Sequence, residues 1–219
     1  SPNTVPGPRV VLFADSFNSY HTPPPLQAAA QFLDVTGHRV EVPEARMCCG
    51  RTLLSKGQIP AAQRRALRTV ETLYPYAEDG VPIVGLEPSC ILTLRDEFLD
   101  LLPGEPRAET VADAAYTFEE YVAERAEDGV FDDATWTDCS TSVMLHGHCH
   151  QKALLGTDAT ERILALPGYD VAAVDAGCCG MAGAFGYEAE HVDVSKQMAE
   201  LRLAPAVRRT DSTTIIAAP

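Results

Sequence analysis

The tripeptide Cys-Cys-Gly occurs twice in this chain, at residues 48–50 and again at residues 178–180. Neighbouring cysteines are poor disulfide partners, because a disulfide needs its two Cα atoms farther apart than adjacent residues allow. Two adjacent thiolates can instead bind one metal centre. The repetition therefore predicts a duplicated domain with a metal or iron–sulfur site built from these two tripeptides, here called the first and second Cys-Cys-Gly corners.

The duplication extends into the flanking apolar runs. The shift in numbering that brings residues 10–13 onto 143–146 is almost the same as the one that brings residues 81–84 onto 213–216. Similarity at a nearly constant offset is the signature of an internal repeat. The sequence predicts a first repeat over residues 1–135, with connecting helices, and a second repeat over residues 136–219.

The order of expected elements predicts an α/β fold with two pseudo-symmetric lobes, each a mostly parallel sheet flanked by helices. Strands are expected at residues 9–14, 39–42, 81–86, 142–146, 171–174 and 213–217. Helices are expected at residues 24–36, 60–76, 91–102, 114–126, 159–166 and 188–208.

Composition excludes several classes of protein. The formal charge of −14 argues against nucleic-acid binding, which depends on clustered lysine and arginine. No apolar stretch approaches the roughly 20 residues of a transmembrane helix, and no signal peptide is visible. Seven cysteines, including two adjacent pairs, favour metal ligation in a reducing cytoplasm over secreted disulfides. A peripheral place at the inner face of the membrane is the other expected location.

The two ends of the chain favour a piece of a longer protein. It opens on a polar linker at residues 1–8 without a starting methionine and finishes just after an expected strand. On this interpretation the second repeat is cut before its last cysteine.

Two further cysteines follow expected strands. Cys90 comes after the strand at 81–86 and Cys149 after the strand at 142–146. In open α/β sheets, ligands gather beyond the carboxyl ends of the strands. The offset between the repeats places Ser16 where the second repeat has Cys149, so the first repeat lacks one thiolate.

Four thiolates are the usual complement of a cubane iron–sulfur cluster and of many structural zinc sites. In the second repeat, the counterpart of Cys90 would fall just beyond Pro219, so the chain supplies three of the four. A cluster is favoured over zinc, and buried cysteines beside a glycine turn are the alternative to any ligand role. Cys139 fits neither motif and is expected to be a non-ligand thiol.

The histidines around Cys149 are also candidates. His146, His148 and His150 alternate, so an extended strand end would place all three on one face and Cys149 on the other. They could bind zinc, relay protons, donate hydrogen bonds to ligand sulfur, or simply bond backbone carbonyls in a tight loop. His21, near Ser16, is a weaker candidate.

Other residues near the corners have expected supporting roles. Gly50, Gly180 and Gly183 are expected to permit close backbone approach to the site. Arg51 and Lys152 could offset thiolate charge or solvate a helix end. The remaining histidines, His38 and His191, are expected on the surface.

The segments 146–154 (HGHCHQKAL) and 177–187 (GCCGMAGAFGY) resemble the CCG, or cysteine-rich, domain family. This family includes the B subunit of heterodisulfide reductase, the iron–sulfur subunits of glycolate oxidase and anaerobic glycerol-3-phosphate dehydrogenase, and the C-terminal parts of FAD-linked, D-lactate dehydrogenase-like oxidases. Residues 15–18 and 87–90 are most similar to the last group. The resemblance covers essentially the whole chain.

The family pattern is a cysteine, then Cys-Cys-Gly, then Cys-x-x-Cys. The resemblance implies metal ligands at Cys149, Cys178 and Cys179 in the second copy. It implies an incomplete set in the first copy, with ligands at Cys48, Cys49 and Cys90. There Ser16 replaces the leading cysteine and Glu87 stands at the first position of Cys-x-x-Cys.

The resemblance implies an electron-transfer domain of an FAD-linked 2-hydroxy-acid dehydrogenase of D-lactate or glycolate type. A [4Fe–4S] cluster would relay electrons from a flavin to an acceptor. FAD would sit on a separate domain, because this chain has no Gly-x-Gly-x-x-Gly fingerprint. The partners would be flavin and ferredoxin-like domains, and the chain alone would not be catalytic. Two alternatives are a zinc-binding or metal-free docking module, and heterodisulfide reductase-like thiol–disulfide chemistry.

Overall fold

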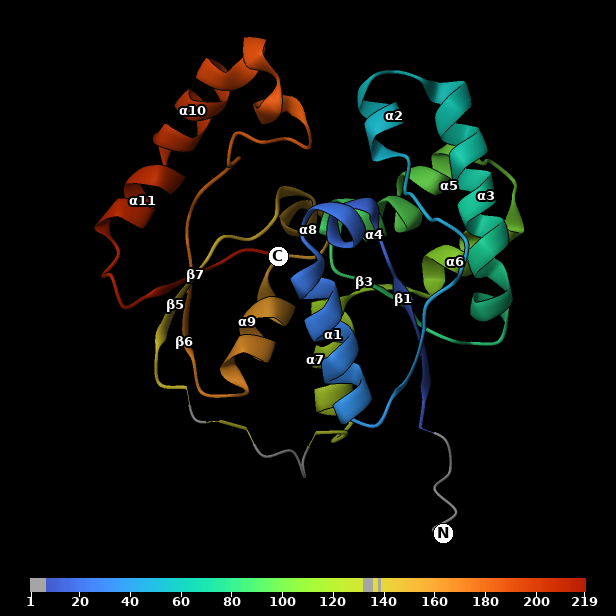
Figure 1. The fold of residues 1–219 in the computed structure, drawn as a ribbon, viewed down its shortest axis with the longest axis horizontal. Helices are drawn as coiled ribbons and strands as arrows, with labels where there is room; N and C mark the ends of the chain where they lie inside the picture. Colours follow the sequence, from blue (N-terminus) through green and yellow to red (C-terminus); the bar gives the residue numbers. More distant parts are fainter. Residues whose placement is uncertain (1–6, 132–135, 138) are drawn as a thin grey trace. The chain divides into compact units, whose positions relative to one another are not determined.

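The chain divides into two compact units, residues 1–134 and 135–219. A computed structural model describes residues 7–131, 136–137 and 139–219. Each unit has its own parallel sheet, drawn in Figure 1, and the two units are described separately. The prediction of an α/β fold with two parallel sheets is confirmed.

The first unit contains a four-stranded sheet in the order β2-β1-β3-β4, and all of its neighbouring strands are parallel. Its strands are β1 (Arg9–Phe13), β2 (Arg39–Glu41), β3 (Ile83–Gly85) and β4 (Ala115–Thr117). The central strand β1 carries the run of four apolar residues, and all four are buried. A parallel strand that is buried on both faces requires helices on both sides of the sheet.

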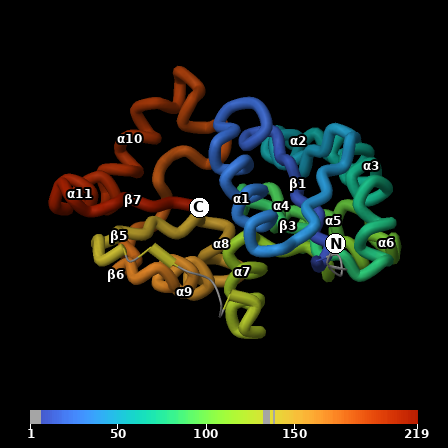
Figure 2. Tube along the Cα trace, turned by 60° about the horizontal axis from the view of Figure 1, so that its bottom comes forward, coloured from blue at the N-terminus to red at the C-terminus, as the bar shows by residue number. Residues whose placement is uncertain are grey.

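Helices cover the two faces of this first sheet (Figures 1 and 2). Helices α1 and α7 lie on one side, where Leu33 and Tyr121 pack with Val10, Leu12 and Val84, and α3 and α6 lie on the other. The helical elements are η1 (Phe17–His21, a π-helical turn), α1 (Pro23–Val35), α2 (Arg51–Ser55), α3 (Ile59–Glu78), α4 (Pro88–Arg95), α5 (Glu97–Leu101), α6 (Pro106–Asp113) and α7 (Phe118–Glu127).

The second unit contains a three-stranded parallel sheet in the order β6-β5-β7. Its strands are β5 (Ser142–Leu145), β6 (Asp170–Ala173) and β7 (Ile215–Ala217). Its helical elements are α8 (Cys149–Leu154), α9 (Asp158–Ala165), the 3₁₀ turns η2 (Phe185–Tyr187) and η3 (Ala189–His191), α10 (Val192–Leu201) and α11 (Leu203–Arg209).

The strand registers show that the two sheets are copies. In the first sheet Val11 is paired with Ile83, and in the second Met144 is paired with Ile216. A single shift in numbering converts both members of the first pair into those of the second, and the same shift aligns Ser16 with Cys149. The order β2-β1-β3 corresponds to β6-β5-β7, and the described part of the second unit has no counterpart of β4.

The prediction of one continuous helix over residues 188–208 is wrong. Two 3₁₀ turns precede α10, and the helix then breaks at Arg202, which has φ −146° and ψ −49°. Pro205 explains the break, because its ring clashes with the carbonyl four residues earlier, that of Leu201. A proline shortly past the break is a signal that the sequence already contained.

Two helix predictions in the connecting region need correction. The helix expected at 91–102 begins at Pro88 and is interrupted at Asp96, so it forms α4 and α5. The segment expected as a helix from 114 starts instead with β4. Helix α7 then begins after Thr117, whose hydroxyl accepts the Glu120 N–H while the Glu120 carboxylate accepts the Thr117 N–H.

The two histidines expected on the surface are partly or fully covered. His38 is buried, with its Nδ1 3.1 Å from the Thr36 hydroxyl and its ring edge-on to Tyr121. Burial is the main reason why the pKa of His38 is lowered. His191 is half-buried and stacks on Phe185 with ring centroids 4.0 Å apart.

Of the helices in residues 7–131, 136–137 and 139–219, none combines the length and apolar character needed to cross a bilayer.

Candidate metal centre

The two Cys-Cys-Gly corners share one local geometry. The Gly50 N–H donates to the Cys48 sulfur at 3.4 Å, and the Gly180 N–H donates to the Cys178 sulfur at 3.3 Å. Both glycines have positive φ, +77° and +94°, a region that favours glycine. The glycine of each corner is therefore needed to turn its N–H back onto the first sulfur.

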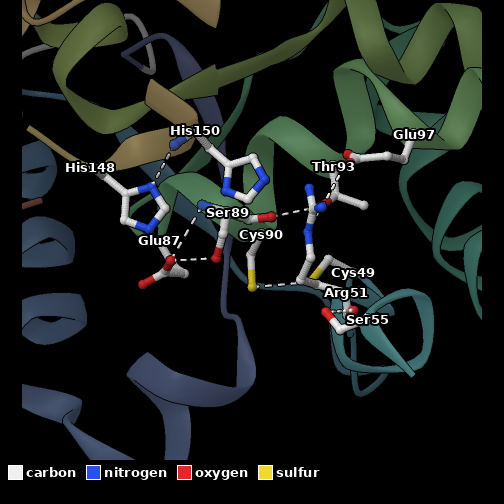
Figure 3. Close-up of polar contacts among 10 residues, drawn as sticks. All are labelled: Cys49, Arg51, Ser55, Glu87, Ser89, Cys90, Thr93, Glu97, His148 and His150. Carbon is white, nitrogen blue, oxygen red and sulfur yellow. Dashed lines mark hydrogen bonds and ion pairs between the residues drawn. The ribbon is translucent and has the colours of Figure 1, made fainter. Parts of the chain in front are cut away.

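In the first unit, the corner is held against α3 and α4. The Thr69 hydroxyl on α3 donates to the Cys48 carbonyl oxygen at 3.1 Å. Cys49 and Cys90, which lies in the first turn of α4, are both buried, and their sulfurs are 3.1 Å apart (Figure 3). The structure thus brings together two thiols that are 41 residues apart in sequence.

The pKa values of the Cys48 and Cys49 thiols are both raised. Contact with the Cys49 thiol, and then burial, raise the pKa of Cys48. Cys48 itself lowers the pKa of Cys49, but the contact with Cys90 and burial outweigh it, so the pKa of Cys49 is also raised.

Glu87, expected at a ligand position, caps helix α4. Its Oε1 accepts hydrogen bonds from the Ser89 N–H at 3.3 Å and from the Ser89 hydroxyl at 2.5 Å. Burial raises its pKa, and the two bonds from Ser89 oppose that rise. Ser16 is half-buried at the start of the π-helical turn, and His21 is exposed beside Phe17. Ligand roles for Glu87, Ser16 and His21 remain predictions.

Asp15 was missed by sequence reasoning, although it follows the buried strand β1. It is fully buried, and its Oδ1 accepts the N–H groups of Phe17 at 2.8 Å and Asn18 at 3.0 Å. Its Oδ2 accepts from the Asn18 side-chain amide at 2.8 Å. Asp15 therefore shapes the turn that carries Ser16, the position aligned with Cys149.

We expect Asp15→Ala to lower the free energy of unfolding of the chain by about 2 kcal/mol, because it leaves buried N–H groups without an acceptor. Urea unfolding followed by circular dichroism measures the change. The exposed Asp34 supplies the control, and Asp34→Ala should change the value by no more than about 0.5 kcal/mol. Equal effects of the two substitutions would contradict a structural role for Asp15.

Arg51 directly follows the first corner, but its charge is matched within the protein. Its guanidinium forms an ion pair with Glu97, and its Nε donates to the Thr93 hydroxyl at 3.2 Å (Figure 3). These contacts tie the start of α2 to α4 and α5. Arg51 therefore stabilises the position of the first corner relative to α4 and α5.

In the second unit, Cys149 begins helix α8. The expected extended alternation of histidines is wrong there, because β5 ends at Leu145 and His150 already lies within α8. His148 is the N-cap, and its Nδ1 accepts the His150 N–H at 3.2 Å (Figure 3). As a result, the potential ligand atoms of His148, Cys149 and His150 all lie within 4.8 Å of one another.

Lys152 links the helix that carries Cys149 to the second corner. Its Nζ donates to the carbonyl oxygens of Ala176 at 2.5 Å and Gly177 at 3.3 Å, just before Cys178. Burial, followed by the positive charge of Lys152, lowers the pKa of His146. Lys152 thus holds the two cysteine-bearing segments of the second unit side by side, which its position in sequence did not indicate.

The glycines expected at close approaches differ in their surroundings. A Cβ on Gly180 would lie 2.2 Å from the Ser195 carbonyl oxygen on α10. A Cβ on Gly50 would make only ordinary contact with Arg65, and one on Gly183 would meet no atom within 4 Å. The tightest backbone approach is therefore at the second corner.

The donor atoms of the two units fit a metal group differently. In the second unit, thiols and imidazoles near Cys149, with N–H donation to the Cys178 sulfur, suit thiolate-bound iron or zinc. Among the described residues, however, Cys149, Cys178 and Cys179 do not form a group with all ligand atoms within 4.8 Å. Their joint ligand role remains a prediction.

The thiols of the first unit, as they are packed, do not fit a bound zinc ion or iron–sulfur cluster. Two thiolates on one tetrahedral zinc are about 3.8 Å apart, given Zn–S bonds of about 2.3 Å. Thiolates on different irons of a cubane are farther apart still, because each iron takes its own cysteine. The 3.1 Å separation of the Cys49 and Cys90 sulfurs is shorter than either arrangement.

Comparison with known proteins shows the family. The chain is 24% identical over 190 residues to the C subunit of anaerobic glycerol-3-phosphate dehydrogenase of Escherichia coli, covering 86% of this chain and 47% of that protein. It is 28% identical over 193 residues to D-2-hydroxyglutarate dehydrogenase of Pseudomonas putida, covering 87% of this chain and 18% of that protein. It is 28% identical over 186 residues to lactate utilization protein A 2 of Bacillus mycoides, covering 80% of this chain and 72% of that protein.

The chain thus spans about half of the first of these relatives and less than a fifth of the second. The model of the CCG cysteine-rich domain matches residues 14–95 and 143–219, one segment in each unit. This chain belongs to the CCG cysteine-rich domain family.

Proposed function

We propose that this chain is the iron–sulfur electron-transfer domain of a flavin-linked 2-hydroxy-acid dehydrogenase system. Two of the relatives are named as a dehydrogenase or a dehydrogenase subunit, and a third is named for lactate utilization. The repeats underlying this function are taken as residues 1–135 and 136–219.

The observation that carries the proposal is the placement of the second corner. Strands β5 and β6 are adjacent and parallel, so their carboxyl ends meet at one edge of the sheet. Cys149 follows β5, and Cys178-Cys179-Gly180 follows β6. Lys152 bridges the two segments. Ligands of open α/β sheets gather at such an edge.

The proposed ligands are Cys149, Cys178 and Cys179, with a [4Fe–4S] cluster as the favoured group. Such a cluster would supply one-electron relay between a flavin and an acceptor. The Gly180 N–H would donate to ligand sulfur, as it does to Cys178 here, and such bonds tune the potential of a cluster. His146, His148 and His150 would support the ligands.

The remaining parts of the proposal concern the larger protein. FAD would be bound by a separate domain, which would oxidise a 2-hydroxy acid of D-lactate or glycolate type. A ferredoxin-like domain and an electron acceptor would be the other partners. The chain alone would not be catalytic and would act in the cytoplasm or at the inner face of the membrane.

One observation favours zinc as the second candidate. The ligand atoms of His148, Cys149 and His150 lie within 4.8 Å of one another, and imidazole with thiolate is a common zinc donor set. On this alternative the chain would be a structural or docking module.

The test is anaerobic purification of the chain, together with any residues that follow Pro219 in its gene. We expect a brown protein with iron and acid-labile sulfide. Cys178→Ser should lose most of both, because it removes a ligand. Cys139→Ser is the matched control and should retain them, because Cys139 lies outside both corners and its N–H bonds the Pro167 carbonyl.

A colourless protein with one equivalent of zinc, lost in Cys149→Ser, would replace the relay with the docking module. Reduction of small disulfides by the protein without a flavin domain would instead favour heterodisulfide reductase-like chemistry.

A further inference from the structure

The first unit contains a pair of thiols whose packing does not suit a metal. We propose that Cys49 and Cys90 form a reversible intramolecular disulfide, so that the first Cys-Cys-Gly corner is a two-electron thiol site oxidised by a hydroperoxide. This inference is independent of the cluster proposed for the second unit, because it uses only residues of the first.

The separation of the sulfurs carries the inference. The Cys49 and Cys90 sulfurs are 3.1 Å apart, while a disulfide bond is about 2.05 Å long. An approach of about 1 Å therefore completes the bond. Ligation to one zinc would require the sulfurs to separate to about 3.8 Å. Cys48, by contrast, cannot readily join Cys49, because their Cα atoms are adjacent in sequence.

Two other positions of the first unit where the family pattern has cysteine ligands are held by residues without a thiol. Glu87 uses its carboxylate to cap α4 through Ser89. Ser16 offers a hydroxyl in place of a thiol. Arg51, the cation closest in sequence to the corner, is already paired with Glu97. A cluster of thiolates would therefore lack its full donor set.

The chemistry balances with hydrogen peroxide as the oxidant. One thiol loses its proton, and its sulfur attacks a peroxide oxygen, which breaks the O–O bond and gives a sulfenic acid and water. The second sulfur attacks the sulfenyl sulfur, the S–S bond forms, and a second water leaves. Two thiols and one peroxide thus give one disulfide and two waters. A dithiol such as dithiothreitol reverses the reaction by thiol–disulfide exchange.

The bond would join two parts of the first unit that are distant in sequence. Cys49 lies in the loop before α2, and Cys90 lies in α4. Closing this covalent loop would pin the corner to α4, adding to the bridge that Arg51 makes to Thr93. Because a cross-link restricts the unfolded chain, the oxidised first unit should unfold at a higher temperature than the reduced one.

The test uses the full chain and a triple variant in which the three proposed ligands of the second unit are replaced (Cys149→Ser, Cys178→Ser, Cys179→Ser). Four of the seven cysteines then remain: Cys48, Cys49, Cys90 and Cys139. After treatment with hydrogen peroxide, alkylation under denaturing conditions should count two free thiols instead of four. Peptide mass mapping should find Cys49 joined to Cys90, in this variant and in the unaltered chain. Dithiothreitol should restore all the thiols.

Matched substitutions locate the bond. Cys49→Ser and Cys90→Ser should each abolish the cross-link, whereas Cys48→Ser and Cys139→Ser should retain it. Far-UV circular dichroism establishes that each variant is folded. The unaltered chain provides a second readout, because its melting temperature should rise on oxidation and fall again with dithiothreitol.

Three outcomes would overturn the proposal. The first is complete alkylation of Cys49 and Cys90 in the oxidised, unaltered chain. The second is a cross-link that joins Cys48 instead of Cys49 to Cys90. The third is stoichiometric zinc or iron that this triple variant retains and that it loses when Cys49 is also replaced by serine, since that metal would be held by the first corner. None of these outcomes bears on cluster binding by the second unit.

Discussion

Replacing Gly180 by alanine is expected to lower the free energy of unfolding of the second unit by about 3 kcal/mol. Two effects add. At φ +94° an alanine is strained, and its Cβ would lie 2.2 Å from the Ser195 carbonyl oxygen and 3.0 Å from the Ser195 hydroxyl. The carbonyl belongs to the backbone of α10, so a side-chain rotation cannot relieve the clash. The corner and α10 must move apart.

Gly183 supplies the matched control for this substitution. It also has positive φ, +68°, but a Cβ there would meet no atom within 4 Å. Gly183→Ala should therefore lower the free energy of unfolding only through backbone strain, by about 1 kcal/mol. Urea unfolding of both variants, followed by far-UV circular dichroism, gives the comparison. If Gly180→Ala were no more destabilising than Gly183→Ala, the close approach to Ser195 would not be needed for stability.

Glu119→Gln is expected to stabilise the chain by about 3 kcal/mol above pH 7. Glu119 lies in the first turn of α7 and is buried, and its Oε2 has no hydrogen-bond partner among the described residues. Burial raises its pKa to about 7 and Glu120 adds to the rise, while its own N–H and the Thr117 hydroxyl oppose it. The folded protein must therefore bury a carboxylate at high pH, and glutamine removes that cost.

The pH dependence has a definite sign. Between pH 4.5, the usual pKa, and about 7, the folded state retains a proton that the unfolded state releases. The free energy of unfolding contributed by Glu119 therefore falls as pH rises through this window. Below pH 4.5 the carboxyl is neutral in both states, and Glu119→Gln should match the unaltered chain.

Urea unfolding at pH 4.5, 6 and 8 would measure this dependence. The exposed Glu109 provides the control, and Glu109→Gln should leave the curve unchanged within about 0.5 kcal/mol. A Glu119→Gln difference that is the same at all three pH values would contradict titration of Glu119 as its cause.

Much of the fold could be predicted from local pattern. The apolar run at 10–13 is typical of a buried strand, and the structure places it at the centre of the first sheet. Its repetition at 143–146 predicts the second sheet, and the strand registers reproduce the same offset. Such signals are readable because a buried parallel strand needs an uninterrupted apolar segment.

Other elements were missed where the signal is short or local. Strand β4 has three residues, so nothing in its pattern separates it from the helix that follows. Helix α8 has six residues, and its N-cap is a histidine instead of the serine, threonine or aspartate that usually marks a helix start. The histidine geometry around Cys149 was therefore predicted as extended when it is helical.

The sequence by itself determined that this is a duplicated α/β chain with a Cys-Cys-Gly turn in each half, because strand patterns and glycine turns are local. Only the tertiary structure decided which thiols meet and what surrounds them. The 3.1 Å contact of Cys49 with Cys90 and the bridge from Lys152 to Ala176 join residues 41 and 24 positions apart. Such contacts depend on how helices and loops pack against the sheet, and a shift of about one ångström in that packing distinguishes a thiol pair from a metal site.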